Sequence, residues 1–176
     1  MRRLRYGVAM SLDGFIAGPN GEYDWIVMDP DFDWNALYGQ FDTLVIGRRT
    51  YETMCERGMS PTSMGMKAVV VSTTLAPDQH RDVTVVVSNV AESVASLKAE
   101  PGKDIWLCGG GVLFRYLLDA GLVDGIDLAV VPVLLGSGVP LLPEGQRCKL
   151  KLVESKTRPS GIVMVKYDVM PLTAAA

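Results

Sequence analysis

The sequence is poor in the residue types on which many enzymes and secreted proteins depend. The single histidine among 176 residues is His80, so neither a Ser-His-Asp triad nor a zinc site rich in histidine is expected. His80 lies in the polar stretch Pro77–Asp82, which predicts a surface loop. Cys55, Cys108 and Cys148 are widely spaced and odd in number. They therefore predict neither a disulfide framework nor a metal site.

An excess of positive charge and a long hydrophobic run are also missing. Lys and Arg total 17 against 20 Asp and Glu, which gives a net charge of −3 and argues against nucleic acid or an anionic membrane as a partner. The uncharged run Leu128–Pro143 is shorter than the roughly 20 residues of a membrane span and is broken by proline and glycine. With 48% apolar and 21% charged residues, the chain predicts one globular, cytoplasmic domain over residues 1–176.

Short apolar runs alternate with segments that have the pattern of helices. Because the runs are almost continuously apolar, both faces of the sheet are expected to be covered by helices. The alternation predicts an α/β fold with a mostly parallel sheet. The predicted strands are Leu4–Ser11, Thr43–Gly47, Lys67–Ser72, Val83–Val87, Asp104–Cys108 and Ile126–Leu134, and the predicted helices are Trp34–Phe41, Arg49–Arg57, Val90–Glu100 and Val112–Ala120.

The C-terminal part has a different pattern. Cys148–Thr157 and Ile162–Met170 alternate apolar and polar residues around the turn Arg158–Gly161, which predicts an antiparallel hairpin at an edge of the sheet. Since exposed edge strands tend to pair, we expect a homodimer. Leu172–Ala176 is expected to be a frayed tail.

A first glycine marks the end of the second predicted strand, in the run Gly47-Arg48-Arg49-Thr50. Glycine allows a tight turn, and the amides of the following helix N-terminus can hold a phosphate. The two arginines add donors suited to phosphate. An ordinary helix start with solvated arginines is the alternative.

A second glycine run, Gly109–Gly111, follows the predicted strand that ends at Cys108. Three glycines cost backbone entropy, and a pyrophosphate approaching the next helix N-terminus would explain them. A tight strand-to-helix turn is the alternative. The run is neither a Rossmann fingerprint, because Phe114 takes the place of the last glycine, nor a P-loop, because no GK[ST] follows.

Two such helix ends in one parallel sheet favour a ligand with separated phosphates, because ligands bind beyond the carboxyl ends of the strands. NADPH, which carries a 2′-phosphate as well as a pyrophosphate, fits that description. Ser72, Thr73 and Thr74 follow another strand and could donate hydroxyl groups to the adenosine phosphate. An ordinary turn would explain them equally well.

Four stretches of the chain resemble the dihydrofolate reductase superfamily, and within it are most similar to the bacterial riboflavin-biosynthesis reductase domain, the C-terminal half of a bifunctional deaminase-reductase. The four stretches are Ser11–Ala17, Val45–Glu52, Cys108–Gly111 with the helix after it, and Leu134–Leu141. Their order and spacing match the family over nearly the whole chain. The resemblance implies a dihydrofolate-reductase-like α/β fold with a mostly parallel central sheet, flanking helices and a C-terminal antiparallel hairpin. The zinc signature of the deaminase half is absent, so reduction alone is implied.

The resemblance also implies where NADPH binds. Ala9, Ile16 and Ala17 would line the nicotinamide. The cofactor phosphates would be held by Gly47, Arg48, Arg49, Thr50, Ser72, Thr73, Gly109, Gly110, Gly111, Val112, Leu113 and Phe114.

For the proton that accompanies hydride transfer, the resemblance implies a carboxylate near the first helix. Asp33 is the first choice and Asp31 the second, although Asp33 could instead be a helix N-cap. Trp34, Leu37 and Tyr38 would wall a substrate pocket or belong to ordinary packing. Asp13 and the amides of the Gly136–Gly138 stretch would contact substrate, or Asp13 would cap a turn.

The resemblance predicts an NADPH-dependent reductase of a small heterocyclic or ribosylamino substrate, and the nearest named activity is reduction of 5-amino-6-(5-phosphoribosylamino)uracil. A dihydrofolate or other pterin reductase and a non-catalytic NADP-binding module are the alternatives.

Overall fold

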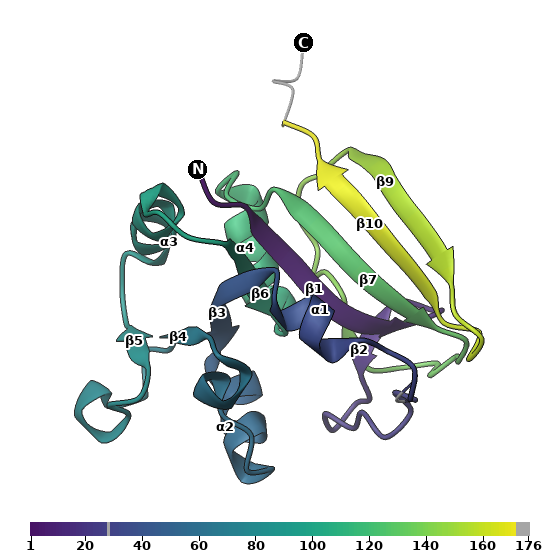
Figure 1. Ribbon diagram of the computed structural model, residues 1–176, viewed down its shortest axis with the longest axis horizontal. Coiled ribbons are helices and arrows are strands. Elements are labelled where there is room, and N and C mark those ends of the chain that lie inside the picture. Colours follow the sequence, from purple (N-terminus) through teal and green to yellow (C-terminus); the bar gives the residue numbers. More distant parts are fainter. Residues whose placement is uncertain (28, 172–176) are drawn as a thin grey trace.

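The computed structural model describes residues 1–27 and 29–171, and Figure 1 shows the arrangement of the elements. The tail predicted for Leu172–Ala176 lies outside the described residues. The strands are β1 (Leu4–Ser11), β2 (Phe15–Ala17), β3 (Phe41–Gly47), β4 (Lys67–Val71), β5 (Thr84–Val86), β6 (Asp104–Cys108), β7 (Gly125–Val131), β8 (Val139–Pro140), β9 (Leu150–Thr157) and β10 (Val163–Val169). The helices are α1 (Trp34–Tyr38), α2 (Arg48–Glu56), α3 (Val90–Ala99) and α4 (Gly111–Asp119), with short 3-10 helices η1 (Pro61–Met64) and η2 (Pro77–Gln79).

Eight strands form one sheet in the order β5-β4-β3-β6-β1-β7-β10-β9. The strands from β5 to β7 pair in parallel, and β10 and β9 complete the sheet as an antiparallel hairpin. A second, two-stranded sheet joins β2 to β8. The predicted α/β architecture with a C-terminal edge hairpin is confirmed.

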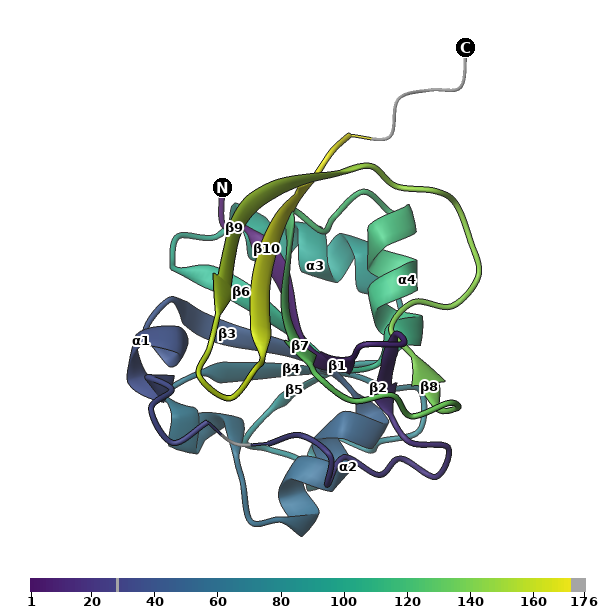
Figure 2. The ribbon, with the colours of Figure 1, turned by 90° about the vertical axis from the view of Figure 1, so that its right-hand side faces the viewer.

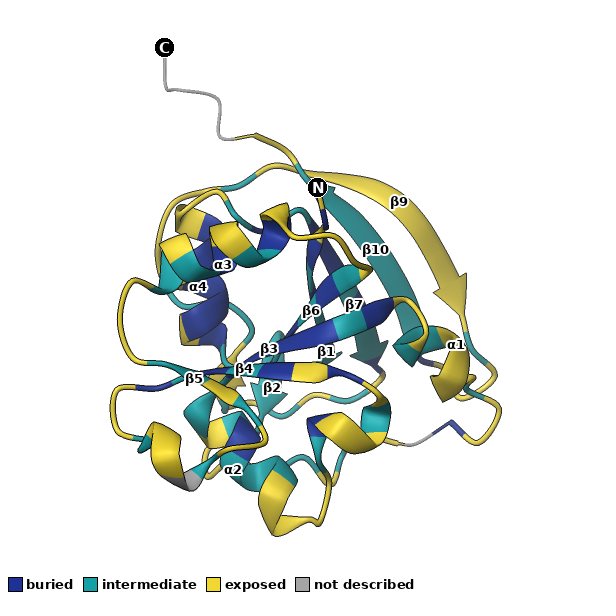
Figure 3. Ribbon diagram, turned by 60° about the vertical axis from the view of Figure 1, so that its left-hand side comes forward, coloured by how far each residue is buried: buried dark blue, intermediate teal, exposed yellow. Residues whose placement is uncertain are grey.

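Apolar clusters cover both faces of the parallel strands, as the continuous apolar runs predicted. One cluster joins Tyr6, Leu107 and Val94 to the buried side of α4. The other joins Leu44 and Ile46 to residues of α1 and α2. Figure 2 shows α3 and α4 on one side of the sheet and α1 and α2 on the other. The edge strand β9 lies outside both clusters and is exposed along its whole length (Figure 3).

Several predicted boundaries differ from the structure for local reasons. The helix predicted over Trp34–Phe41 ends at Tyr38, because Gly39 closes it and Phe41 already pairs with Asp104 in the sheet. The strand predicted over Ile126–Leu134 ends at Val131, since the next residue, Pro132, has no N–H for the ladder. The hairpin strand predicted from Cys148 begins at Leu150.

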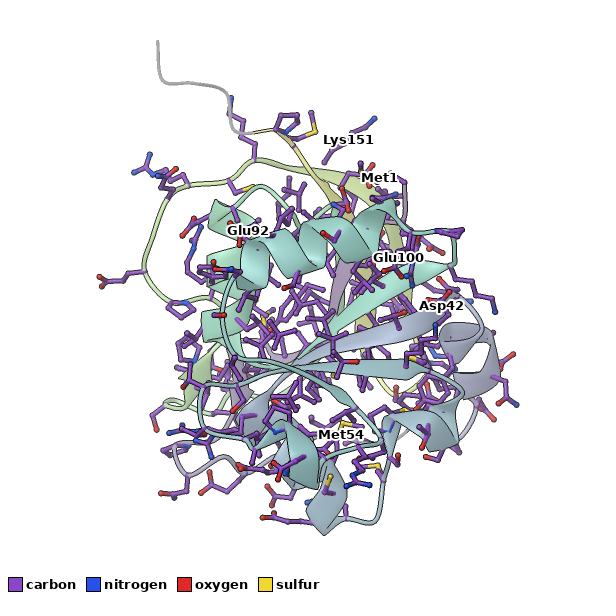
Figure 4. All side chains as sticks on the ribbon, turned by 90° about the vertical axis from the view of Figure 1, so that its left-hand side faces the viewer. Met1, Asp42, Met54, Glu92, Glu100 and Lys151 are labelled. Atoms are coloured by element: carbon purple, nitrogen blue, oxygen red, sulfur yellow. The ribbon has the colours of Figure 1, made fainter. Side chains whose placement is uncertain are left out.

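A polar network closes the edge of the sheet at which the parallel strands begin. Arg2 is buried and pairs with Asp42, and its Nε donates to the Lys103 carbonyl at 2.6 Å. Arg5 pairs with both Asp104 and Asp127. Figure 4 shows Asp42 and Glu100 together at this edge, far from Met54 on α2. The network leaves the opposite edge, where the parallel strands end, to carry the loops of the candidate site.

No helix in residues 1–27 and 29–171 is long and apolar enough to cross a membrane. That residues 1–176 form a single domain stays a prediction.

We expect Tyr6→Phe to leave the free energy of unfolding unchanged or to raise it by up to about 1 kcal/mol. The Tyr6 hydroxyl is buried and has no hydrogen-bond partner among the described residues, so removing it relieves an unpaired polar group. Urea unfolding measures the effect. Tyr51→Phe is the control, because it removes a hydroxyl that lies 3.3 Å from His80 Nδ1, and it should lower stability. A clear loss of stability in Tyr6→Phe would mean that its hydroxyl has a partner.

Candidate active site

The carboxyl ends of β3 and β6 lie side by side, because these strands pair in parallel with Ile46 opposite Cys108. Each strand leads directly into a helix, α2 after β3 and α4 after β6. The two glycine motifs found in the sequence therefore lie at the same edge of the sheet. The β4 strand ends beside them, with Val71 opposite Gly47.

Neither of these two helices has a side-chain cap at its N-terminus. Gly47 is the N-cap of α2 and Gly110 is the N-cap of α4, so the first backbone N–H groups of both helices lack a capping side chain. Unfilled N-termini attract anions through their N–H groups and the helix dipole. Two helix N-termini with this capacity thus lie next to each other.

The space around each glycine shows whether packing within the protein requires a residue without a side chain at that position. A Cβ at Gly109 would lie 2.7 Å from Thr50 Oγ1, and one at Gly111 would lie 2.8 Å from the Pro140 carbonyl oxygen, so both glycines are required by contacts within the protein. Gly110 has a φ of +71° and open space where a Cβ would lie. Gly47 has an ordinary φ of −80° and equally open space, so neither its conformation nor its packing calls for glycine.

At the start of α4, some of the residues predicted to bind the cofactor serve packing, whereas others have free backbone amides. The Leu113 and Phe114 side chains are buried in the core, and Phe114 stacks on Tyr6 with its amide donating to the Gly110 carbonyl at 3.1 Å. Phe114 therefore has no free donor for a ligand. The amides of Gly111, Val112 and Leu113 in the first turn remain for this role.

Ser72 and Thr73 lie where β4 ends, next to Gly47, but their side chains differ. The Ser72 hydroxyl is buried and accepts hydrogen bonds from the amides of Thr74 and Leu75 at 3.1 and 3.0 Å. It therefore shapes its own turn. Thr73 is exposed and stays a candidate donor.

An open stretch of β1 is a feature that the sequence did not reveal. The pairing with β6 covers Leu4 to Gly7, whereas the pairing with β7 continues to Ser11. Among the described residues, no strand pairs with residues 8–10 on the β6 side, and Ala9, predicted to line the nicotinamide, lies within this stretch. Such an open edge offers backbone donors and acceptors to a planar amide.

A loop after β7 connects this open edge to the start of α4. Ile16 and Ala17 lie in β2, which pairs with Val139 and Pro140 of β8. The Pro140 and Leu141 carbonyls in turn contact Gly111. Contacts through β8 therefore link the residues predicted to surround the nicotinamide to those predicted to bind the pyrophosphate.

Asp13, just after β1, connects the end of this strand to the loop after β7. Its carboxylate accepts hydrogen bonds from the amides of Leu135 and Gly136, the latter at 2.7 Å, and from the Ser11 hydroxyl at 2.6 Å. The Ser11 bond and the two amides hold the pKa of Asp13 below its ordinary value. The turn-capping role considered for Asp13 is thus present, and its contact with substrate stays a prediction.

Asp33, the first choice for the proton-linked carboxylate, is the N-cap of α1. Its Oδ1 accepts from the Ala36 amide at 2.8 Å, and the residue is exposed. Behind it, aromatic rings form a row from the loop to the sheet. Successive ring centroids are 4.7, 5.7, 5.9 and 5.6 Å apart in the order Phe32, Trp34, Tyr38, Trp106 and Phe41. Trp34 and Tyr38, predicted to wall the substrate pocket, are both in this row.

An ion pair that the sequence gave no reason to expect attaches this loop to the hairpin. Arg158 Nε donates to Asp29 Oδ2 at 2.8 Å, and its Nη2 donates to the Asp31 carbonyl at 2.9 Å. The hydrogen bond from Arg158 holds the pKa of Asp29 below its ordinary value. Arg158 had been predicted only as part of a turn, and no local pattern pairs residues so far apart in the chain.

Cys108, the last residue of β6, lies at this edge of the sheet. Burial raises the pKa of the Cys108 thiol to about 12, so it stays protonated at neutral pH. Within the described ranges, no group of three or more His, Cys, Asp or Glu side chains is placed to hold a metal ion.

Comparisons with known proteins agree with this geometry. The sequence model of the RibD C-terminal domain family matches residues 2–164. The chain is 36% identical to YyaP, an uncharacterized protein of Bacillus subtilis, over 94% of each chain. A crystal structure of a putative riboflavin biosynthesis protein from Shewanella sp. PV-4 superposes with a TM-score of 0.82 at 28% identity, covering 96% of this chain and 99% of that one. Dihydrofolate reductase from Enterococcus faecalis, complexed with NADP(H) and RAB-propyl, shares the fold, with a TM-score of 0.67 at 22% identity over 95% and 94% of the two chains.

We expect the Asp29–Arg158 pair to stabilise the fold above the ordinary pKa of an aspartate, near 4, and to lose this effect as the pH falls through the lowered pKa of Asp29. Asp29→Asn should lower the melting temperature at pH 7, and the difference from the parent chain should shrink in acid. Thermal unfolding between pH 7 and pH 3 measures this. In an Arg158→Met background, Asp29→Asn should have little further effect, and a full effect there would contradict the pairing.

Proposed function

Because the chain belongs to the RibD C-terminal domain family, we propose that it is an NADPH-dependent reductase of a small heterocyclic or ribosylamino compound. The observation that carries this proposal is the pair of uncapped helix N-termini at adjacent strand ends, one of them with a glycine N-cap, Gly47, that neither packing nor backbone conformation requires. The nearest named reaction is the reduction of 5-amino-6-(5-phosphoribosylamino)uracil.

Each uncapped helix receives one phosphorylated part of the cofactor in this proposal. Arg48, Arg49 and the first amides of α2 hold the 2′-phosphate, with Thr50 and Thr73 beside them. The first amides of α4 hold the pyrophosphate. Arg49 forms no ion pair in the described part of the chain, and Arg48 pairs only with the half-exposed Glu52 one turn away. Both guanidinium groups are therefore available at small cost.

The remaining residues orient the reaction. Bound NADPH supplies the hydride, and the protein supplies position and a dry site. The open backbone of β1 around Ala9, together with Ile16 and Ala17, holds the carboxamide and presents one face of the nicotinamide. Asp33 uses Oδ1 as a helix cap, which leaves Oδ2 for a proton-linked contact with substrate, and Asp31 is the second candidate. We further propose a homodimer, formed through the exposed edge strand β9.

We expect the double variant Arg48→Ala/Arg49→Ala to weaken NADPH binding by at least tenfold and NADH binding much less, because only NADPH carries the 2′-phosphate. Fluorescence titration with both cofactors measures the two dissociation constants. Arg57→Ala, which removes an arginine just after the other end of α2, is the matched control and should change neither. An equal loss for NADPH and NADH would contradict the assignment of the arginines.

We expect Gly47→Ala to fold normally and to bind NADPH at least tenfold more weakly. The added methyl group meets no protein atom, but it lies where the protein backbone is proposed to contact the cofactor. The melting temperature and the dissociation constant are compared in one preparation. Ala36→Ser on α1 is the control and should leave the dissociation constant unchanged. Gly21→Ala is not used, because a φ of +90° at Gly21 would strain an alanine. Unchanged affinity would show that nothing approaches Gly47.

A further inference from the structure

We propose that the substrate enters this site without a phosphate or another strong anionic group, as a neutral or cationic heterocycle. This inference rests on the proposed function and narrows its substrate class to compounds without the phosphate that the substrate of the nearest named reaction carries. Its basis is that the structural features able to bind an anion on the substrate side already hold carboxylates of the protein itself. These carboxylates all come from the segment between β1 and α1.

The first such feature is the N-terminus of α1, which lies beside the residues predicted to wall the substrate pocket. Asp33 caps it through the 2.8 Å bond to the Ala36 amide. The capping carboxylate accepts from one of the first N–H groups of this five-residue helix and repels a second negative charge.

The second feature is a pair of consecutive backbone amides in the loop after β7, at Leu135 and Gly136. Consecutive amides of this kind form anion-binding concavities. Here both donate to the Asp13 carboxylate, at 3.0 and 2.7 Å to Oδ2. Asp13 therefore occupies the place that a substrate phosphate or carboxylate would take.

The third feature is Arg158, a guanidinium at the hairpin turn. Its side chain is only 17% exposed, and it is held by the Asp29 carboxylate, the Asp31 carbonyl and a contact over the Phe32 ring. Asp29 is itself 8% exposed. Arg158 cannot turn toward a substrate without breaking its ion pair with the buried Asp29 carboxylate, which is costly.

The charge distribution along the chain agrees with these contacts. Between Arg5 and Arg48 the sequence has no Lys, Arg or His, and the opposite loop, from Pro132 to Pro143, is uncharged. Cations from other parts of the chain contact this region at its rim: Arg57 stacks on the Tyr23 ring at 3.7 Å, and Lys103 Nζ donates to the Gly39 carbonyl, just after α1, at 2.8 Å. The acidic residues between β1 and α1 are Asp13, Glu22, Asp24, Asp29, Asp31 and Asp33.

The cofactor side presents the opposite arrangement. Helices α2 and α4 have no side-chain caps, and Arg48 and Arg49 begin α2. A phosphate there finds amides and guanidinium groups, whereas a phosphate on the substrate side would lose its water without gaining a cation. The site is therefore built for one phosphorylated ligand, the cofactor, and for an uncharged or positively charged second ligand.

A matched pair of probes tests this inference on the full chain loaded with NADP⁺. The probes are 5-amino-6-(ribosylamino)uracil and its 5′-phosphate, and calorimetry gives both dissociation constants. We expect the phosphorylated probe to bind at least tenfold more weakly. Equal or tighter binding of the phosphorylated probe would overturn the inference.

Two variants test whether the internal carboxylates are the cause. Asp29→Asn releases Arg158, and Asp31→Lys adds a cation at an exposed position. Each variant should therefore reduce the ratio of the two dissociation constants, phosphorylated over unphosphorylated probe (the gap), at least threefold. Glu154→Gln is the matched control, because it frees Lys166 from a 2.6 Å ion pair on the outer hairpin and should leave the gap unchanged. A gap that neither site variant narrows would refute the role of these carboxylates.

If neither probe binds, the sign of the electrostatic potential at the site tests the inference instead. Trp25 and Trp34 lie in the acidic segment, so caesium should quench tryptophan fluorescence more than iodide does, relative to acrylamide. Equal or stronger quenching by iodide would overturn the inference. NADPH titration of the same preparations separates the two proposals, because a failure to bind NADPH contradicts the proposed function, whereas a preference for the phosphorylated probe contradicts only this inference.

Discussion

The contact between Gly109 and Thr50 is the constraint on which the site depends. It forces the turn after β6 against the first turn of α2, and a side chain at position 109 would push the two apart. Because β3 and β6 are neighbours in the sheet, this contact sets two uncapped helix N-termini side by side. Their spacing is thus fixed by sheet geometry and by one missing side chain, before any ligand arrives.

The unequal lengths of neighbouring strands create the second half of the site. β6 ends at Cys108, while β1 continues with β7 for four more residues, from Val8 to Ser11. The stretch of β1 that extends past β6 leads into β2, which pairs with β8. A planar group can therefore bind to main-chain atoms that the sheet itself leaves unpaired.

Local patterns predicted the elements well but not the contacts between them. The apolar runs identified Leu4–Ser11 and Asp104–Cys108 with their observed bounds, because a strand buried on both faces has few other compositions. The glycine run was read as one unit, yet Gly109 and Gly111 serve packing and Gly110 alone faces open space. Sequence spacing cannot make that distinction, since the atoms that Gly111 meets belong to Pro140 and Leu141. The Asp29–Arg158 pair was missed for the same reason.

Carboxylates that accept hydrogen bonds from the protein's own donors help to hold the segment from Leu12 to Asp33. Its attachments to the rest of the fold include the Leu12 amide to the Val133 carbonyl, Asp13 to the amides of the same loop, the pairing of β2 with β8, and Asp29 to Arg158. These contacts form without a ligand, whereas the N-termini of α2 and α4 lack capping side chains. Binding the cofactor would fill those positions and add negative charge to a site already rich in aspartate. With the proposed cofactor bound, a second ligand meets a potential that favours neutral or positively charged groups, because the carboxylates of the segment add to the negative charge of the cofactor.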